Sequence, residues 1–266
     1  MRLAISNIAW GCEQDTQVYE MMKKYGFAGL EIAPTRIFEQ QPYDRLDEAK
    51  SWAESIKKEH GLQVASLQSI WYGRQENIFR SQAERELLLA YTEKAIDFAV
   101  AAGAENLVFG CPKNRSIPAR AKGAYCSGLA MEFFCRLGEY AAAKGVFIGL
   151  EANPPMYQTN YLNNTDEVID LLMALASPGL KLNLDVGTMI ANDEVARLLE
   201  GKVRFVSHVH VSEPGLQVIS KRSLHRELAA ILAAEGYSGF VSVEMGKVDD
   251  IAVLEKVMLY VREVFG

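Results

Sequence analysis

Residues 205–213 read F-V-S-H-V-H-V-S-E, and several other stretches of the chain share this pattern. Valine alternates with polar residues, as in a β-strand whose successive side chains point to opposite faces. His208 and His210 would therefore share one face, with Val209 and Val211 on the other. A strand with a merely polar face fits this pattern, and so does a strand that supplies imidazoles to a metal. The ends of the other strands bear on that choice.

Short apolar stretches alternate with longer amphipathic ones along the whole chain. The expected strands are 2–6, 28–32, 62–68, 105–109, 146–151, 180–185, 205–211 and 240–244. The expected helices are 14–25, 46–60, 82–102, 123–144, 166–176, 192–200, 223–235 and 249–264. Eight strand-then-helix units predict an α/β fold with parallel strands and crossover helices, closed into a (β/α)8 TIM barrel. An open doubly wound sheet is the alternative, but the sequence lacks the G-x-G-x-x-G fingerprint of its dinucleotide-binding versions. No Pro/Gly/Ser-rich linker divides the chain, so residues 1–266 are expected to form a single domain.

Composition narrows the class of protein. Of the 266 residues, 49% are hydrophobic and 23% are charged, which is typical of a globular protein. The net charge of −6 argues against a nucleic-acid partner, whose binding surface usually needs a basic field. No apolar run approaches the ~20 residues of a membrane span, and the N-terminus does not read as a signal peptide. The four cysteines form no C-x-x-C pair, so we expect a reduced, cytoplasmic protein.

Strand parity points a titratable side chain inward at the end of each of the last four strands. These side chains are Glu151, Asp185, His210 and Glu244. Barrel enzymes keep their active sites at the C-terminal ends of the strands, so the four would meet in the barrel mouth. Carboxylates clustered in a concave mouth repel one another unless a cation compensates them. Three oxygen donors with one imidazole suit Mn²⁺, Mg²⁺ or Co²⁺, and Zn²⁺ is also compatible.

Six motifs carry a resemblance to a known superfamily. They are G-L-E-I-A (29–33), G-L-E-A-N-P (149–154), N-T-D-E-V (164–168), L-N-L-D-V-G (182–187), H-V-H-V-S-E (208–213) and V-S-V-E (241–244). Their order and spacing resemble the xylose-isomerase-like barrel superfamily of sugar and sugar phosphate isomerases and epimerases, which also includes endonuclease IV. The resemblance extends over essentially the full length of the chain.

The resemblance implies a metal site and a mechanism. In the ketose 3-epimerase branch the four matching positions bind one divalent metal, so Glu151, Asp185, His210 and Glu244 are the expected ligands, with Mn²⁺ the expected ion. The two glutamates of that branch also form an acid/base pair on opposite faces of the substrate, which assigns catalysis to Glu151 and Glu244. One carboxylate would remove a carbon-bound proton, the metal would stabilise the enediolate, and the other carboxylate would return the proton.

Three positions depart from the epimerase pattern. Thr188 stands where that pattern has a histidine, Leu216 where it has an arginine, and Tyr157 where a further glutamate is expected. Those residues contact substrate in the epimerases. The resemblance therefore leaves the identity of the substrate open, and the reaction could have changed to dehydration or to another isomerisation.

Several further side chains are candidate substrate contacts. His208 and Glu31 share the inner strand faces, with core packing or a structural ion pair as the alternatives. Strand-end amides could bond sugar hydroxyls, and rings just past strand ends could stack on a sugar, although loop packing is the alternative for all of them. These amides and rings are Asn7, Gln68, Asn153, Trp10, Trp71, Tyr72 and Tyr157.

Basic residues and the other histidines complete the inventory. Lys221 and Arg222 could reach an anionic substrate or form a solvated charge pair, and Lys247 follows the eighth strand, where barrels often bind phosphate. His60 and His225 are expected on helix surfaces.

The sequence therefore predicts a metal-dependent carbohydrate isomerase or epimerase acting on a small-molecule sugar or sugar phosphate. The main alternative is a related lyase or dehydratase acting on a keto sugar or inositol derivative. An endonuclease IV-like repair enzyme would need more histidines and a basic surface, and a non-catalytic sugar-binding barrel would not need the full ligand set. The resemblance also implies a homodimer or a homotetramer, and no nucleic-acid or membrane partner is expected.

Overall fold

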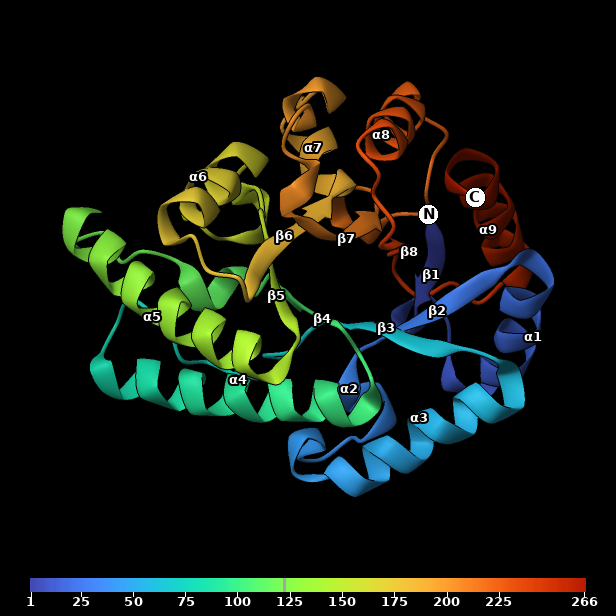
Figure 1. Cartoon of the computed structure of the whole chain (residues 1–266), viewed down its shortest axis with the longest axis horizontal. Coiled ribbons are helices and arrows are strands. Elements are labelled where there is room, and N and C mark those ends of the chain that lie inside the picture. Colours follow the sequence, from blue (N-terminus) through green and yellow to red (C-terminus); the bar gives the residue numbers. More distant parts are fainter. Residues whose placement is uncertain (122) are drawn as a thin grey trace.

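The computed structural model describes residues 1–121 and 123–266, and over these residues it forms a closed barrel of eight parallel strands (Figure 1). The strands are β1 Arg2–Ser6, β2 Phe27–Ile32, β3 Gln63–Leu67, β4 Asn106–Phe109, β5 Phe147–Glu151, β6 Leu180–Asp185, β7 Val206–Val211 and β8 Phe240–Val243. They follow one another around the barrel in chain order, and β8 pairs with β1 to close it. The predicted (β/α)8 TIM barrel is confirmed, and each strand lies within one residue of its predicted bounds.

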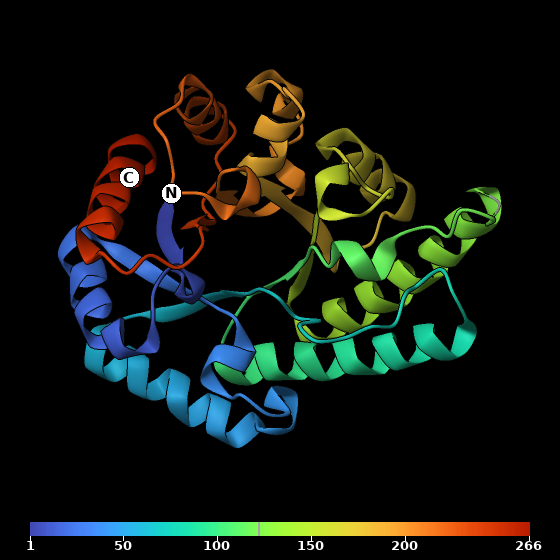
Figure 2. The ribbon, with the colours of Figure 1, turned by 180° about the vertical axis from the view of Figure 1, so that it is seen from behind.

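Helices surround the strands on the outside, as Figures 1 and 2 show from opposite sides. They are α1 Asp15–Tyr25, α2 Pro34–Ile37, α3 Leu46–His60, α4 Gln82–Ala102, α5 Gly123–Lys144, α6 Thr165–Leu175, α7 Val186–Ala191, α8 Ser223–Ala234 and α9 Ile251–Phe265. Among the described residues, no helix has the length and apolar character needed to cross a membrane.

The predicted helix at 192–200 is wrong. The helix after β6 is α7, which begins directly at the end of the strand, and only a 3₁₀ turn, Ala196–Leu199, follows within the predicted range. The reason is local, because the carboxylate of Asp185 accepts hydrogen bonds from the backbone N–H groups of Gly187 and Thr188. A side-chain acceptor at this position satisfies the free donors of a first helical turn.

The two faces of the strands have different surroundings. Outward-facing apolar side chains such as Leu30, Leu184 and Val209 are fully buried against the helix layer. Inside the barrel, Ala4, Ala65 and Phe240 form a small apolar cluster of their own. A Cβ atom on Gly29 would lie 2.5 Å from the ring of Phe240, so this glycine leaves the space that the ring occupies. Above this floor the barrel interior is polar.

Candidate metal centre

The ends of β5 to β8 bring four donor side chains together at the C-terminal end of the barrel. Asp185 and His210 are paired in register on β6 and β7. The Nδ1 atom of His210 lies 3.1 Å from Glu151 Oε2 and 3.2 Å from Glu244 Oε2. One donor atom each from Asp185, His210 and Glu244 lie within 4.8 Å of one another. The four side chains that strand parity pointed into the mouth therefore face a common point.

Hydrogen bonds hold the carboxylate of Glu151 from both sides. Asn153 Nδ2 donates to Oε1 at 2.9 Å, and Asn183 Nδ2 donates to Oε2 at 2.7 Å. Gly110, at the end of β4, lies so close that a Cβ atom there would be 2.8 Å from Oε1. The orientation of this carboxylate is therefore set by its neighbours.

Hydrogen bonds also fix the orientation of the Asp185 carboxylate. Its carboxylate accepts from Thr188 N–H at 2.9 Å, from the Thr188 hydroxyl at 2.7 Å and from the Ser212 hydroxyl. Burial, and then the neighbouring Glu151 carboxylate, raise the pKa of Asp185. Thr188, one of the three departures from the epimerase pattern, thus serves as a donor to a candidate ligand.

The electrostatics of the cluster favour a bound cation. Burial raises the pKa of Glu244 to about 7. Burial lowers the pKa of His210, but the carboxylates of Glu244 and Glu31 outweigh it and hold that pKa well above its ordinary value. A divalent cation bound among these carboxylates would compensate their mutual repulsion and lower their raised pKa values.

Glu31 lies beneath His210 and is fully buried. Its Oε1 accepts from His210 Nε2 at 2.9 Å and is 3.3 Å from His208 Nε2, while its Oε2 accepts from the Ser242 hydroxyl at 2.9 Å. Burial raises the pKa of Glu31, but His210 and then His208 lower it well below its ordinary value. Because Nε2–H of His210 is committed to Glu31, Nδ1 is the ring nitrogen that faces Glu151 and Glu244, and a metal that displaced its proton would meet its lone pair. This position does not fit the substrate contact expected of Glu31 or of His208, because both lie under the site.

The sequence profile of the xylose isomerase-like TIM barrel family matches residues 19–263. The chain belongs to this family. A comparison with curated protein sequences finds no significant match.

Solved structures of several members of this fold are similar to the chain over its whole length. The structure of 3-keto-D-glucoside 4-epimerase (YcjR) from E. coli is 20% identical, with a TM-score of 0.79 and 99% of each chain covered. The complex of D-psicose 3-epimerase from Clostridium cellulolyticum H10 with D-tagatose is 17% identical, with a TM-score of 0.77, covering 100% of this chain and 99% of that one. The structure of IOLI protein with a zinc atom is 15% identical, with a TM-score of 0.70, covering 99% and 96%.

Tyr157 lies at the mouth of this family barrel, close to the candidate metal centre. Its hydroxyl accepts a hydrogen bond from Gly215 N–H at 2.7 Å, so it bridges the loops that follow β5 and β7. Burial raises the pKa of Tyr157, and the carboxylates of Asp185 and Glu244 add to the increase. Tyr157 and Asn153 are thus the two expected substrate contacts that the structure places beside the four donors.

Four other expected substrate contacts are buried and bonded to neighbouring parts of the fold, although Trp71 also lines a hollow formed by the loops after β3 and β4. Trp10 donates to Asp15 at 2.7 Å, and Trp71 donates to Thr92 at 2.8 Å and packs on aromatic side chains of the core. Asn7 and Gln68 are also buried, where Asn7 accepts from a backbone N–H of the loop after β2 and Gln68 donates to a β1 hydroxyl. The polar atoms of these four side chains form hydrogen bonds between strands, helices and loops.

The other two histidines lie outside the mouth. His60 ends α3, whereas His225 in α8 is fully buried with Nδ1 3.0 Å from the Tyr260 hydroxyl. The predicted surface position of His225 is therefore wrong. Only two histidines of the chain stand at the barrel centre, which leaves His210 as the imidazole donor among three carboxylates.

Arg115 was missed by sequence reasoning. Its guanidinium is fully buried, and Nη2 donates to the backbone oxygen of Glu151 and to Asn153 Oδ1, both at 2.7 Å. Burial lowers the pKa of Arg115 to about 10. No periodicity marks this residue, because it lies in a short 3₁₀ helix after β4, Pro112–Arg115. Arg115 fixes Asn153, which in turn fixes the carboxylate of Glu151.

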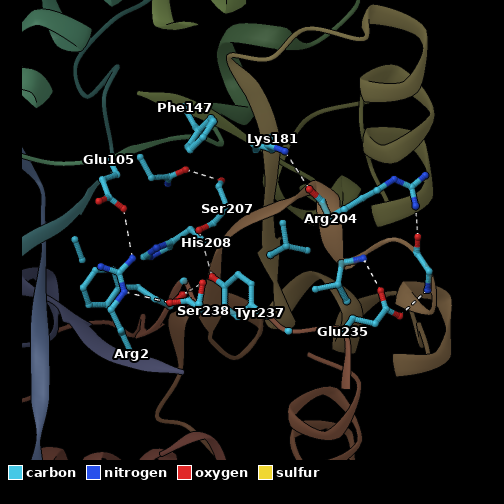
Figure 3. Close-up of a pocket in the computed structure, with 18 residues that line it drawn as sticks. Arg2, Glu105, Phe147, Lys181, Arg204, Ser207, His208, Glu235, Tyr237 and Ser238 are labelled. Atoms are coloured by element: carbon cyan, nitrogen blue, oxygen red, sulfur yellow. Dashed lines mark hydrogen bonds and ion pairs between the residues drawn. The ribbon is translucent and has the colours of Figure 1, made fainter. Parts of the chain in front are cut away.

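A separate hollow of about 510 Å³ opens at the opposite end of the barrel (Figure 3). It is lined by the N-terminal ends of strands and reaches up to His208. The charged side chains around it bond to near neighbours, since Arg2 donates to Glu105 and Lys181 donates to the backbone oxygen of Arg204. This end of the barrel therefore offers no free donor set comparable to the mouth.

Proposed function

We propose that the protein is a divalent-metal-dependent sugar isomerase or epimerase. The observation that carries this proposal is that Glu151 and Glu244 face Nδ1 of the buried His210 while Asp185 offers a further donor atom within 4.8 Å of those of His210 and Glu244, at the end of the barrel where this fold places its active sites. The names of the similar solved structures, two sugar epimerases and a zinc-bound protein, support the same class of substrate and cofactor.

The donor set fits one divalent ion. Glu151, Asp185, His210 and Glu244 would hold it, and three oxygen donors with one nitrogen donor suit Mn²⁺, with Mg²⁺, Co²⁺ or Zn²⁺ as alternatives. The hydrogen bond from His210 to Glu31 leaves the correct ring nitrogen free to coordinate. Among the ion pairs of the described residues, His210 is the group that faces both Glu151 and Glu244, so no lysine or arginine competes for this position.

The reaction follows from the placement of two carboxylates. A bound divalent ion would polarise the substrate carbonyl and stabilise negative charge on its oxygen. Glu151, oriented by Asn153 and Asn183, would take or return a carbon-bound proton. Glu244, the other carboxylate of the pair, would exchange a proton on the opposite face of the substrate. If one carboxylate removes the proton on one face and the other returns it on the opposite face, the carbon centre is inverted.

Solvent-proton exchange tests the proposal directly. The metal-loaded protein is incubated with a panel of ketoses and keto sugars in D₂O, and deuterium uptake at carbon is followed by NMR. We expect exchange on at least one sugar, and its loss in both Glu151→Gln and Glu244→Gln. Failure of every sugar to exchange, with the metal bound, would refute the isomerase and epimerase assignment.

A further inference from the structure

Two hollows are formed by the loops that follow β2, β3 and β4. One, of about 650 Å³, is lined by the loops after β3 and β4 and by Gln158, and we call it the Lys113 hollow. The other, of about 680 Å³, is lined mainly by the loops after β2 and β3. The two share Tyr72, whose side chain is 72% exposed. Volumes of this size are typical of small-molecule sites.

The loop that carries Tyr72 has a defined shape. Tyr72 N–H donates to the backbone oxygen of Ser69 at 2.9 Å, and Arg74 N–H donates to that of Trp71 at 3.0 Å. Gly73 between them has φ of +81°, which a residue with a side chain rarely adopts. These two tight turns hold the ring of Tyr72 and the guanidinium of Arg74 at the edge of both hollows.

The Lys113 hollow lies directly beside the metal centre. Cys111 lines the hollow, and the preceding residue, Gly110, is in contact with the carboxylate of Glu151. Residues 110 and 111 therefore connect the wall of the hollow to the carboxylate of Glu151.

The charge of the hollow is positive. Among the described residues that line it, the charged ones are Arg74, Arg80 and Lys113, and no aspartate or glutamate lines it. Arg74 pairs with Glu76, and Arg80 lies 3.8 Å from Glu84. Lys113 takes part in none of the ion pairs found in the described part of the chain. A free cation in an acidic chain, at the edge of a cavity, favours an anionic ligand.

The usual phosphate position of TIM barrels, after β7 and β8, is already neutralised here. Lys247 lies 3.8 Å from Glu13 and 3.7 Å from Asp249. Arg222 donates twice to the buried carboxylate of Glu213, at 2.8 and 2.5 Å. Arg74 and Arg80 in the Lys113 hollow also have carboxylate partners, so the two places differ in Lys113, which has no ion-pair partner among the described residues. The β3 and β4 loops are thus the better place for a negative charge.

We propose that the substrate carries an anionic group, a phosphate or a carboxylate, at the end remote from the reacting carbonyl, and that Lys113 binds it in the Lys113 hollow, where Arg74 and Arg80 add positive charge while paired with Glu76 and Glu84. This inference rests on the proposed function and narrows it to a sugar phosphate or a sugar acid.

Binding measurements on the metal-loaded protein test the inference without requiring turnover. D-fructose, D-fructose 6-phosphate and D-fructuronate form a matched neutral, phosphate and carboxylate series for calorimetric titration. We expect at least one anionic ketose to bind about tenfold more tightly than the neutral one, because charge-assisted hydrogen bonds add to the sugar contacts. In the double variant Arg80→Gln/Lys113→Met the preference should fall below about threefold, while the affinity for D-fructose stays within about twofold. The stronger of the two anions identifies the group.

Lys247→Met is the matched control, because it removes a cation from the other side of the mouth and should leave the preference intact. Equal binding of neutral and anionic ketoses, no binding of either anionic ketose at millimolar concentration, or a preference that survives the double variant would each overturn the inference. Deuterium exchange separates the two proposals. Anion binding that depends on Lys113, without deuterium exchange on any sugar, would support the anion site and refute the proposed reaction. Deuterium exchange without a preference for anionic ketoses would support the reaction and refute the anion site.

Discussion

Replacing Gly110 with alanine should weaken metal binding while leaving the fold intact. The added Cβ would lie 2.8 Å from Glu151 Oε1 and 3.5 Å from Asn153 Oδ1. Ordinary contact begins near 3.4 Å, so the carboxylate oxygen must withdraw by about 0.6 Å. That movement stretches the 2.9 Å hydrogen bond from Asn153 Nδ2 beyond its useful range.

The size of the effect follows from this displaced carboxylate. A hydrogen bond to a charged group contributes about 1.5–3 kcal/mol, and each 1.4 kcal/mol is about tenfold in affinity. Loss of a neighbour that orients a metal ligand usually costs about 10–100-fold in affinity, which is the range we expect for Gly110→Ala. The metal-free fold should be little affected, because the end of a glutamate side chain can swing toward the mouth.

Two measurements separate metal affinity from stability. Titration with Mn²⁺ gives the affinity, and thermal unfolding in excess chelator gives the stability of the metal-free chain. The matched control is Gly128→Ala on an exposed part of α5, where no described atom lies within 4 Å of the new Cβ. It should keep wild-type affinity and gain up to about 1 kcal/mol of stability from helix propensity. An affinity of Gly110→Ala within about threefold of wild type would show that Glu151 does not ligate the metal in this orientation.

Three further predictions concern the same centre. Asp185→Asn should remove most of the bound metal, measured as metal content per chain. The fold should be kept, because asparagine caps a helix as well as aspartate does. Wild-type metal content in this variant would contradict the ligand assignment. Because burial raises the pKa of Glu244 to about 7 and a proton there competes with the metal, affinity should fall at least about fivefold from about pH 7 to about pH 6 and approach about tenfold per unit below that. A flat profile over this range would exclude Glu244 as a ligand. Glu31→Gln should lower Mn²⁺ affinity about 10–100-fold, because it removes the carboxylate that orients the His210 ring. Ser242→Ala, which removes only a hydrogen bond to that carboxylate, is the milder control, and equal effects of the two variants would argue against this role of Glu31.

Local patterns in the sequence were sufficient for the barrel and for the four donors. Period-two alternation is a property of a few adjacent residues, so each strand could be placed within one residue. Repetition of the strand–helix unit makes all strands parallel, which carries their last side chains to the same end. Glu151, Asp185, His210 and Glu244 could therefore be grouped although nearly 100 residues separate the first from the last.

Contacts between distant loops and across the barrel required the folded chain. Strand alternation in β2 predicts that Glu31 points into the barrel mouth. In the closed barrel, however, it lies under His210 of β7, which is 179 residues away in the chain. Arg115 and Lys113 lie in a short 3₁₀ helix that no periodicity marks, and their positions depend on how that segment packs against the end of β5 and the loop after β3. The face to which a strand side chain points depends on residues adjacent in sequence, whereas its burial and its ion-pair partners depend on the whole surrounding structure. For this reason the proposed metal ligands could be predicted from the sequence, whereas the residues that orient them and those that line the Lys113 hollow could not.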